Sequence, residues 1–341
     1  MKSYHVTAGQ GLGELETRQR PVPEPGAGQV LVRIRANALS LRELLVLEGD
    51  YPLQITPGVV AGCEGVGEVV AIGAAVHQVK VGERVAATVF PHWIDGSFCF
   101  DYAAQLGSSL DGLLTEYAVL PESGVVPIPE HLSYDEAAAF PLIGLTAWNA
   151  LTGGHGLQPG ETVLTLGSGG VSLFALQFEK LAGAEVIATS SSPAKADRLK
   201  DLGASAVVDY SKNPHWYEEV RALTGQRGAD HVIDVAGVLD QSVRAAALGG
   251  EVTLVGVSQG GAAKAEPLSA ATIFRTGATI RPLAVGSRRQ FLEMNRSVGV
   301  SGLKPVIDRT FGFDEVPEAL AYYRRGQFFG RVIISHASSN D

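Results

Sequence analysis

The sequence predicts an α/β protein of two domains, a β-barrel and a doubly wound parallel sheet with helices on both faces. Up to about residue 125, short β-type runs alternate with turns rich in Gly and Pro. From about residue 160, strand-like and helix-like runs alternate, which indicates a parallel sheet covered by helices. The chain then returns to β-type runs. We therefore expect residues 1–143 and 285–341 to form the first domain and 144–284 the second.

The β-type runs of the first domain have the spacing of half-buried strands. In "QVLVRIRANAL", Val30, Val32 and Ile34 recur at every second position and so share one face. "GVGEVVAIGAAV" and "KVGERVAATV" continue in the same manner. Near the C-terminus, "PVIDRTF" and "GRVIIS" flank a helix predicted at 314–325. These runs predict a compact barrel with strands from both parts of the chain.

The second domain shows a regular series of strands and helices. Helix starts are marked by residues such as Ser192 and Pro193, which suit the N-cap and the first helical position. A last strand, "ATIRPLAV" at 278–285, is expected at the edge of the sheet. The pattern predicts strands "TVLTL", "EVIAT", "SAVVDY", "DHVIDVAG" and "EVTLVGV", with helices at 171–182, from Ser192-Pro193 to near Gly203, from Asn213-Pro214 to near Gly225, and around 239–248.

Composition is that of a soluble globular chain. The 341 residues are 45% hydrophobic and 18% charged, enough for two cores. The net charge of −9 argues against a nucleic-acid partner, whose phosphates would be repelled. No run approaches a membrane span, and "MKSYHVTAGQ" lacks the apolar run of a signal peptide. Cys63 and Cys99 cannot make a disulfide framework, so we expect a cytoplasmic protein without membrane contact.

"LTLGSGGVSLF", residues 164–174, points to a cofactor. Its glycines follow a strand, open a helix and lie within a βαβ series, which is the setting of the dinucleotide-binding G-x-G-x-x-G motif. There the backbone approaches a pyrophosphate, whose charge meets free N–H groups at the helix start. Ser172 replaces the third glycine and is small enough for helix–strand contact; a tight turn without ligand is the alternative. The predicted cradle consists of Gly167, Ser168, Gly169, Gly170 and Val171.

The end of the next strand indicates which dinucleotide is bound. An acidic residue about 20 positions beyond the glycines would hold the ribose hydroxyls of NAD. This chain has Ser190 there, and no carboxylate appears before Asp197. The hydroxyls of Ser190 and Ser191 and the charge of Lys195 suit a 2′-phosphate, which would also offset the unfavourable place of a cation in the first turn of a helix. We therefore predict NADP(H). A solvated surface lysine is the alternative interpretation of Lys195.

With these features together, the chain resembles the medium-chain dehydrogenase/reductase superfamily over almost its whole length. The resemblance rests on "GDYPL", "GCEGVGEVV", "KVGERV", "LTAWNAL" and "GSGGVS", which follow one another in the order typical of the family. It implies a GroES-like β-barrel catalytic domain joined to a Rossmann cofactor domain, with the active site in the cleft between them.

The metal positions of the zinc-dependent members of that superfamily are changed in this chain. Where those members carry a Cys, a His-Glu pair and a second Cys, the corresponding residues are Ser40, Cys63-Glu64 and Leu142. Cys63 and Glu64 are too few for the three protein ligands of a catalytic zinc. The four-cysteine structural zinc lobe is also missing, since Cys99 stands alone in that region. We expect no metal at either site.

The chain instead looks like the zinc-independent branch of quinone oxidoreductases and alcohol dehydrogenase-like proteins. "SLRELLVLEGDYP" and "FPHWIDG" resemble that branch, although Ser40 and Glu43 stand where it usually has Asn and Asp. The resemblance implies a set of cofactor contacts: the serine, lysine and tyrosine that contact NADPH, the threonine near the nicotinamide, and a basic residue near the C-terminus. These correspond to Ser190, Lys195, Tyr210, Thr146 and Arg331.

Hydride transfer without a metal favours one substrate class. The protein must orient the substrate and stabilise charge on its oxygen, which zinc would otherwise do as a Lewis acid. A quinone or an α,β-unsaturated carbonyl suits such a site because conjugation spreads the developing charge. Tyr51 and Ser40 are the candidate hydrogen-bond donors, with water giving the final proton. Alternatively, Tyr51 covers the turn before Pro52, and Ser40 satisfies backbone at a strand end.

Other polar and aromatic residues near these candidates have two possible roles. Arg42 and Glu43 can form a structural ion pair within the barrel. Glu64 can pair with a buried base or touch the substrate. Trp93 can line the cleft, although a large aromatic side chain more often belongs to a core.

The sequence therefore predicts an NADPH-dependent, zinc-independent oxidoreductase that transfers hydride to a small quinone or α,β-unsaturated carbonyl. Two alternatives are a metal-free alcohol dehydrogenase or aldehyde reductase, and a non-enzymatic NADPH-binding protein. In the family, the sheet edge expected at 278–285 commonly pairs with its copy, and an unpaired apolar edge invites aggregation. We therefore expect a homodimer.

Overall fold

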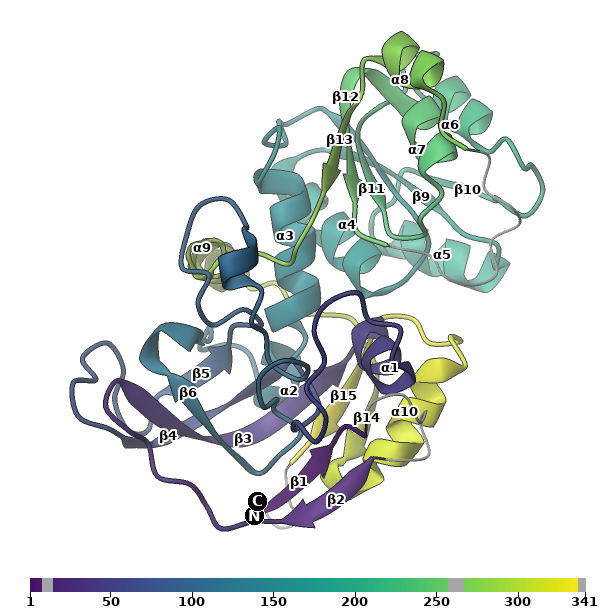
Figure 1. Ribbon diagram of the computed structural model, residues 1–341. Helices are drawn as coiled ribbons and strands as arrows, with labels where there is room; N and C mark the ends of the chain where they lie inside the picture. Colours follow the sequence, from purple (N-terminus) through teal and green to yellow (C-terminus); the bar gives the residue numbers. More distant parts are fainter. Residues whose placement is uncertain (8–14, 257–266, 337–341) are drawn as a thin grey trace. The chain divides into compact units, whose positions relative to one another are not determined.

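The computed structural model describes residues 1–7, 15–256 and 267–336 (Figure 1). The chain divides into two compact units. Residues 1–145 and 286–341 form the first unit, and residues 146–285 form the second. The first unit is therefore discontinuous in sequence, because the chain leaves it and returns after the second unit is complete.

The second unit is built on a parallel sheet, as predicted. In the described part of the chain this sheet has six strands in the order β10-β9-β8-β11-β12-β13, and each neighbouring pair is parallel. Every residue of the central β8 is buried, as expected for a strand covered on both faces. The strands are β8 (Thr162–Thr165), β9 (Glu185–Thr189), β10 (Ala206–Val208), β11 (Ala229–Asp234), β12 (Ala246–Leu254) and β13 (Thr279–Pro282).

Helices form two groups around this sheet (Figure 1). Val220 of α6 and Val243 of α7 share one core with Leu164 of β8, and α7 contacts both α6 and α8. α4 contacts β8, β9 and α5 instead. The helices of this part of the chain are α3 (Leu145–Thr152), α4 (Gly170–Ala182), α5 (Pro193–Leu202), α6 (Tyr217–Leu223), α7 (Leu239–Ala245) and α8 (Ala270–Thr276).

The strand order reverses between β8 and β11, and ligands of doubly wound sheets bind at such a reversal. From β8 the chain adds β9 and β10 on one side, and from β11 it adds β12 and β13 on the other. In doubly wound sheets, ligands bind outside the carboxyl ends of the strands at such a reversal. Gly167 follows β8 and Asp234 ends β11, so both residues lie at this point.

The long strand β3 organises the sheet of the first unit. It pairs with β4 along one edge, while its first half pairs with β6 and its second half with β15 along the other. Val30, Val32 and Ile34, predicted to share a face, lie in one core with residues of β4, β5, β6 and β7. The strands of this sheet are β3 (Gln29–Leu39), β4 (Gly65–Ile72), β5 (Arg84–Ala87), β6 (Tyr117–Pro121), β7 (Val125–Pro127), β14 (Ile307–Gly312) and β15 (Arg331–Ser335). β1 (Lys2–His5) and β2 (Glu16–Gln19) pair with each other in a separate two-stranded sheet.

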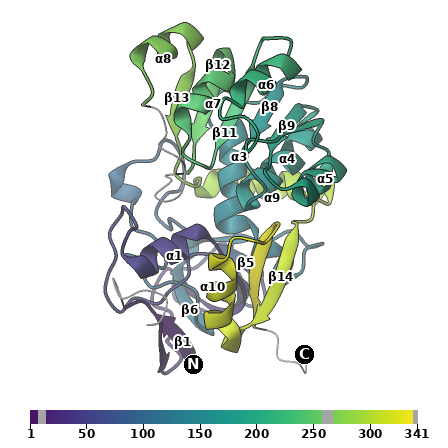
Figure 2. The ribbon, with the colours of Figure 1, turned by 90° about the vertical axis from the view of Figure 1, so that its right-hand side faces the viewer.

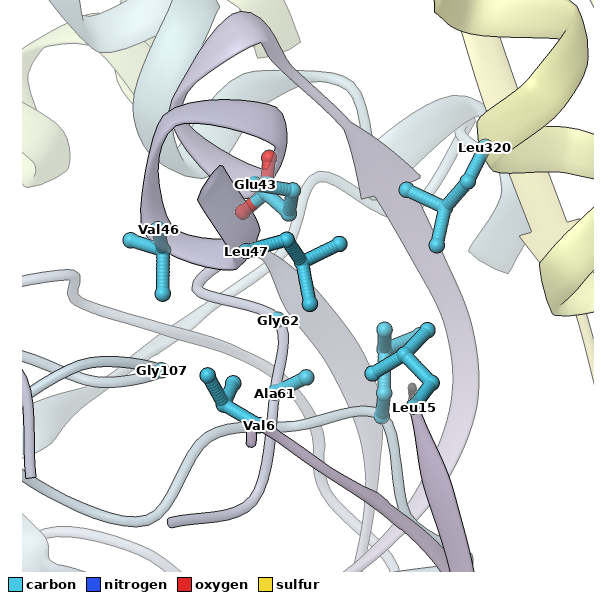
Figure 3. Close-up of a pocket in the computed structure, with 10 residues that line it drawn as sticks. Val6, Leu15, Glu43, Val46, Leu47, Ala61, Gly62, Gly107 and Leu320 are labelled. Atoms are coloured by element: carbon cyan, nitrogen blue, oxygen red, sulfur yellow. The ribbon is translucent and has the colours of Figure 1, made fainter. Parts of the chain in front are cut away.

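A second core of the first unit joins its helices to this sheet. α10 packs against β14 and β15 (Figure 2), and its Leu320 shares the core with Leu47 of α1. A small pocket opens in this core, and Glu43 is the charged residue among the described side chains that line it (Figure 3). The helices are α1 (Leu41–Glu48), α2 (Tyr134–Ala137), α9 (Arg288–Ser301) and α10 (Val316–Arg324), with a π-helical turn at Phe140–Gly144 and short 3₁₀ turns at Phe100–Tyr102, Glu122–Gly124 and Phe313–Glu315.

Several elements differ from the sequence-based expectation. α1 and α9 were not predicted, since both regions were assigned to β-type segments. α6 begins at Tyr217, because the Asn213 carboxamide accepts the His215 N–H and holds a turn before the helix. α7 ends at Ala245, and β12 starts at the next residue. Position 257 of the predicted strand 251–257 lies outside the described residues.

Among the described residues, no helix has the length and apolar character needed to cross a membrane.

Candidate cofactor and catalytic sites

The glycine turn after β8 has an open surface. Gly167 has φ of +77°, a conformation that favours glycine, and its N–H donates to Thr189 Oγ1 at 3.0 Å. A Cβ placed on Gly167 or Gly169 would meet no heavy atom of the described residues within 4 Å. The turn is thus fixed to the end of β9, and the described residues leave space beside these two glycines.

The first turn of α4 suits an anion. Gly169 is the N-cap and supplies no side-chain hydrogen bond, so the first N–H groups of this 13-residue helix have no cap of that kind. Ser172, which replaces the third motif glycine, is buried and donates to the Leu166 carbonyl at 2.7 Å. Its hydroxyl thus joins α4 to the end of β8. The residues present fit a dinucleotide, with the N-terminus of α4 toward its pyrophosphate.

The residues predicted to select the cofactor gather where β9 ends. Ser191 Oγ donates to Tyr210 Oη at 2.9 Å, and both side chains are exposed. Ser190 is buried, and its hydroxyl donates to the Ser192 carbonyl and accepts the Ser192 N–H, each at 3.2 Å. Lys195 lies in the first turn of α5. Ser191 and Tyr210 therefore lie at the surface with their hydroxyls bonded to each other, whereas Ser190 shapes the turn.

Sequence reasoning missed a role for Asp234 at the end of β11. Its Oδ1 accepts the N–H groups of Ala236 and Gly237 at 2.9 and 2.7 Å, and its Oδ2 accepts the Ser242 hydroxyl at 2.9 Å. This buried carboxylate fixes the loop that faces the glycine turn across the strand reversal. The run Asp-Val-Ala-Gly at residues 234–237, at a strand end, was the available signal, because Asp commonly binds nearby backbone N–H groups.

Thr146 and Arg331 lie in different units. Thr146 is buried in the first turn of α3. Arg331 begins β15, is buried, and forms an ion pair with Glu64. The Glu64 carboxylate also accepts the N–H groups of Leu142 and Ile143 at 3.0 and 3.4 Å. Glu64 therefore pairs with a buried base, one of the two roles expected from the sequence.

Ser40 has a structural partner. It is the N-cap of α1, and both its N–H and its hydroxyl donate to Glu43 Oε2, at 2.8 and 2.6 Å. The other carboxylate oxygen, Oε1, accepts from the Cys63 thiol at 3.0 Å and lies 3.9 Å from Arg42 Nη1. Burial and the nearby Glu43 carboxylate raise the pKa of the Cys63 thiol.

Tyr51 lies beside the Arg42 guanidinium, which is 4.9 Å from the centre of its ring. Its hydroxyl donates to Gln105 Oε1 at 2.9 Å, and the same oxygen accepts from Arg42 Nη2 at 3.0 Å. The first unit thus joins the candidate residues Ser40 and Tyr51 through a buried polar cluster that contains Arg42, Glu43 and Gln105. Trp93 is buried against the rings of Phe90 and Phe98, which supports its assignment to a core.

Comparison with known proteins identifies the family. The chain matches the alcohol dehydrogenase GroES-like domain over residues 26–130 and the zinc-binding dehydrogenase domain over residues 170–298. It is 36% identical to a zinc-type alcohol dehydrogenase-like protein of Schizosaccharomyces pombe over 95% of this chain and 96% of that one. This chain belongs to the medium-chain dehydrogenase/reductase superfamily. As a medium-chain dehydrogenase/reductase it is an NAD(P)H-dependent oxidoreductase, which confirms the resemblance and the fold class.

Solved structures of other medium-chain dehydrogenases/reductases support this assignment. An NAD-dependent alcohol dehydrogenase superimposes with a TM-score of 0.88 at 33% identity, covering 99% of this chain and 100% of that one. A mycobacterial quinone oxidoreductase superimposes with a TM-score of 0.79 at 25% identity, covering 98% and 99% of the two chains. A mycobacterial relative solved with NADPH has a TM-score of 0.81 at 25% identity, covering 98% of this chain and 99% of that one.

The residues of this medium-chain dehydrogenase/reductase do not fit the zinc of its zinc-dependent relatives. Leu142 has no ligating atom, and the Cys63 thiol donates to Glu43 Oε1 at 3.0 Å. The Glu64 carboxylate is paired with Arg331. Within the described ranges, no three His, Cys, Asp or Glu side chains are grouped as metal ligands. No step of the chemistry below is therefore assigned to a metal.

Proposed function

We propose that this chain is an NADPH-dependent reductase of quinones or α,β-unsaturated carbonyls that works without zinc. The observation that carries the proposal is the chemistry at the three metal positions. Ser40 donates to Glu43, Cys63 is a buried protonated thiol held by the same carboxylate, and Leu142 is apolar. Hydrogen bonds from the protein must then stabilise the substrate oxygen in place of a Lewis acid.

In the proposed reaction, the cofactor and the substrate are held by different groups of residues. A bound nicotinamide supplies the hydride. The glycine turn and the start of α4 hold the pyrophosphate, and polar groups of the first unit hydrogen-bond the substrate oxygen. A quinone or enone needs less stabilisation at that oxygen than a simple alcohol, because conjugation delocalises the charge. Tyr51 and Ser40 belong to this proposed site, in which their hydroxyl groups orient Gln105 and Glu43.

The choice of NADPH over NADH rests on the end of β9. Ser191 and Tyr210 present neighbouring hydroxyl groups, Lys195 adds a charge to the first turn of α5, and β9 ends without a carboxylate that would repel a phosphate. We propose that the 2′-phosphate of NADPH binds at these three residues. Thr146 and Arg331 remain proposed contacts on the nicotinamide side.

Cofactor titration tests this choice. In fluorescence titrations, the native chain is expected to bind NADPH at least tenfold more tightly than NADH. Lys195→Ala should weaken NADPH binding about tenfold and leave NADH binding unchanged, because one charge-assisted contact is worth roughly 1–2 kcal/mol. Lys200→Ala, at the exposed far end of α5, is the matched control and should change neither affinity. Equal affinity of the native chain for the two cofactors would contradict the proposal.

Turnover assays test the substrate class. The native chain should oxidise NADPH in the presence of 1,4-benzoquinone or 2-cyclohexen-1-one, at rates that a metal chelator does not change. The double variant Ser40→Ala, Tyr51→Phe should turn over the quinone more slowly. Full activity of that variant would remove both residues from the site, and absence of quinone and enone reduction by the native chain would reject the proposed reaction.

A second candidate function is interconversion of an alcohol and an aldehyde without metal. It is favoured by the S. pombe relative, described as zinc-type alcohol dehydrogenase-like, and by the NAD-dependent alcohol dehydrogenase structure. Oxidation of 1-butanol with NADP⁺, measured with and without chelator, separates the two functions. Alcohol oxidation faster than quinone reduction would favour this second candidate.

A further inference from the structure

Two buried hydrogen-bond donors of the polar cluster lack an acceptor among the described residues. They are Nη1 of Arg42 and Nε2 of Gln105. The two residues are 7% and 0% exposed, respectively. Native proteins leave few buried polar groups unpaired, because such groups lose their hydrogen bonds to water without replacement. A ligand that brings an acceptor oxygen would account for these groups.

The remaining contacts of Arg42 hold its guanidinium in place. Nε and Nη2 both donate to Gln105 Oε1, at 3.3 and 3.0 Å, and Nη2 also donates to the Leu106 carbonyl at 2.8 Å and to Ser108 Oγ at 3.1 Å. The Tyr51 ring lies along the group and donates its own hydroxyl to the same Gln105 oxygen. One edge of the guanidinium is thus fixed by the protein, and Nη1 has no hydrogen-bond acceptor among the described residues.

Glu43 balances the charge of Arg42 but does not satisfy Nη1. Its Oε1 is 3.9 Å from Nη1, beyond hydrogen-bond distance, and accepts the Cys63 thiol and N–H at 3.0 and 3.3 Å. Its Oε2 accepts from Ser40. The carboxylate is therefore already occupied on both oxygens. A neutral carbonyl group is the acceptor that fits beside this ion pair, because it adds no further charge.

We propose that Arg42 is a catalytic residue that hydrogen-bonds the carbonyl oxygen of a quinone or enone through Nη1. Gln105 and Tyr51 are positioning residues that hold the guanidinium. This inference rests on the proposed function and names the group that stabilises the substrate oxygen. Tyr51 is partly exposed, and the proposed approach of the substrate to the cluster is along its ring.

Reduction of an enone takes place in two steps. Hydride adds to the carbon β to the carbonyl, the C=C electron pair moves toward oxygen, and an enolate forms; the α-carbon then takes a proton from water to give the saturated ketone. The negative charge appears at the oxygen that faces Nη1. Since a guanidinium stays protonated at every working pH and this one is already oriented, the hydrogen bond strengthens as the charge develops.

Binding of p-nitrophenol tests the inference without turnover. Its phenolate resembles the reduced form of a quinone, and visible absorption reports its ionisation. On the native holoenzyme with NADP⁺, the pKa of the bound phenol should fall by about one to three units, because a cation beside it favours the anion. Arg42→Met should abolish this shift. Failure of the phenol to bind the native protein, or an unshifted pKa, would overturn the proposal.

Kinetics supply the second test. Arg42→Met should lower kcat for 1,4-benzoquinone about 10²-fold with KM changed less than threefold, as for loss of a donor that acts in the transition state. Arg42→Lys should recover part of kcat. Arg84 is the matched control: it stacks over Tyr134 at 4.6 Å and donates to the Leu132 carbonyl, so Arg84→Met should leave kcat unchanged.

The outcomes separate this inference from the proposed function. Tight NADPH binding shows that a variant is folded. If the native chain reduces quinones and folded Arg42→Met keeps kcat within threefold, Arg42 is a structural residue and the proposed function stands. If the native chain reduces neither quinones nor enones, the proposed function and this inference both fail. Should Arg42→Met not fold, Arg42→Lys and the phenol titration of the native protein still decide the matter.

Discussion

Glu64 joins three separate segments of the first unit. It precedes β4, pairs with Arg331 at the start of β15, and accepts the backbone N–H groups of Leu142 and Ile143. A buried ion pair of this kind contributes little net stability, because desolvation offsets attraction. Its value lies in specificity, since each charge accepts few alternative partners within a core.

Glu64 also gives the first unit a pH dependence. Burial raises the pKa of Glu64 to about 7 from 4.5, although the Arg331 guanidinium and the Leu142 N–H act in the opposite direction. The folded state therefore holds a proton between about pH 4.5 and 7 that the unfolded state releases. Stability contributed by the protonated group is complete below pH 4.5 and is lost as the pH rises through 7.

We expect Glu64→Gln to flatten this dependence. The measurement is urea unfolding of both proteins at pH 4.5 and pH 7. Between these pH values the free energy of unfolding of the native chain should fall by roughly 3 kcal/mol more than that of the variant, because the variant has no titrating group at this position. Glu68→Gln, a partly exposed carboxylate of β4, is the control and should keep the native slope. Parallel profiles for Glu64→Gln and the native chain would contradict the raised pKa.

Residue roles were predicted from sequence only where neighbours in sequence decide them. The glycine turn is an example, because Gly167 and Ser172 act within one strand–helix connection. Glu64 was expected either to pair with a buried base or to touch the substrate, and the sequence did not name Arg331, which lies 267 positions away, a separation that no local pattern bridges. Ser40 was proposed as a donor, and its hydroxyl donates to Glu43, three residues further on.

At the scale of elements, α4 contains an unusual buried group. Glu179 is fully buried, and neither carboxylate oxygen has a hydrogen-bond partner among the described residues. Burial raises the pKa of Glu179 well above its ordinary value. The folded protein must therefore keep the carboxyl group protonated, which lowers stability progressively as the pH rises above the ordinary range of a glutamate.

We expect Glu179→Met to stabilise the protein at pH 8 by about 1–3 kcal/mol, because an apolar side chain of similar size has no proton to hold and no polar group to satisfy. Thermal unfolding of the holoenzyme at pH 5 and pH 8 measures the effect, which should be smaller at pH 5. Lys180→Met changes the next, exposed residue of α4 and should shift the midpoint little at either pH. A destabilised Glu179→Met variant would show that the carboxyl group has an essential partner.

Elements were predictable where caps and periodicity agree. α4 and α5 begin and end within one residue of the expected positions, because glycine and Ser-Pro signals bound a clear apolar stripe. α1 was missed although Gly49 closes it at φ of +79°, since its eight residues follow β3 after one residue and include several leucines and a valine. Short helices of this kind depend on tertiary packing, here against α10, more than on their own sequence.

For the whole molecule, an exposed apolar surface adjoins the sheet edge of the second unit. β13 is the last strand of that sheet, as predicted for 278–285. Leu248 at 82% and Phe274 at 88% exposure lie on β12 and α8, the elements next to β13. We propose that this edge and these side chains form the interface of a homodimer, because an open apolar edge otherwise promotes aggregation.

Light scattering checks the dimer. The native chain should have twice the monomer mass at micromolar concentration, and Phe274→Asp should shift it to the monomer by burying a charge in the interface. Val300→Asp changes a residue of α9 that is 92% exposed and serves as the control, with an unchanged mass. A native chain that runs as a monomer, or a Phe274→Asp variant that stays a dimer, would reject this interface.

The return of the chain to its first unit sets the order in which the molecule can form during synthesis. Residues 146–285 are continuous, so the second unit has its whole sheet once they leave the ribosome. The sheet of the first unit waits for β15, which pairs with the distant β3, and for β14, which pairs with β15. Such distant closure is slow. The nascent chain therefore carries an unpaired edge along the second half of β3 until β15 has been synthesised, and an unpaired strand edge promotes aggregation.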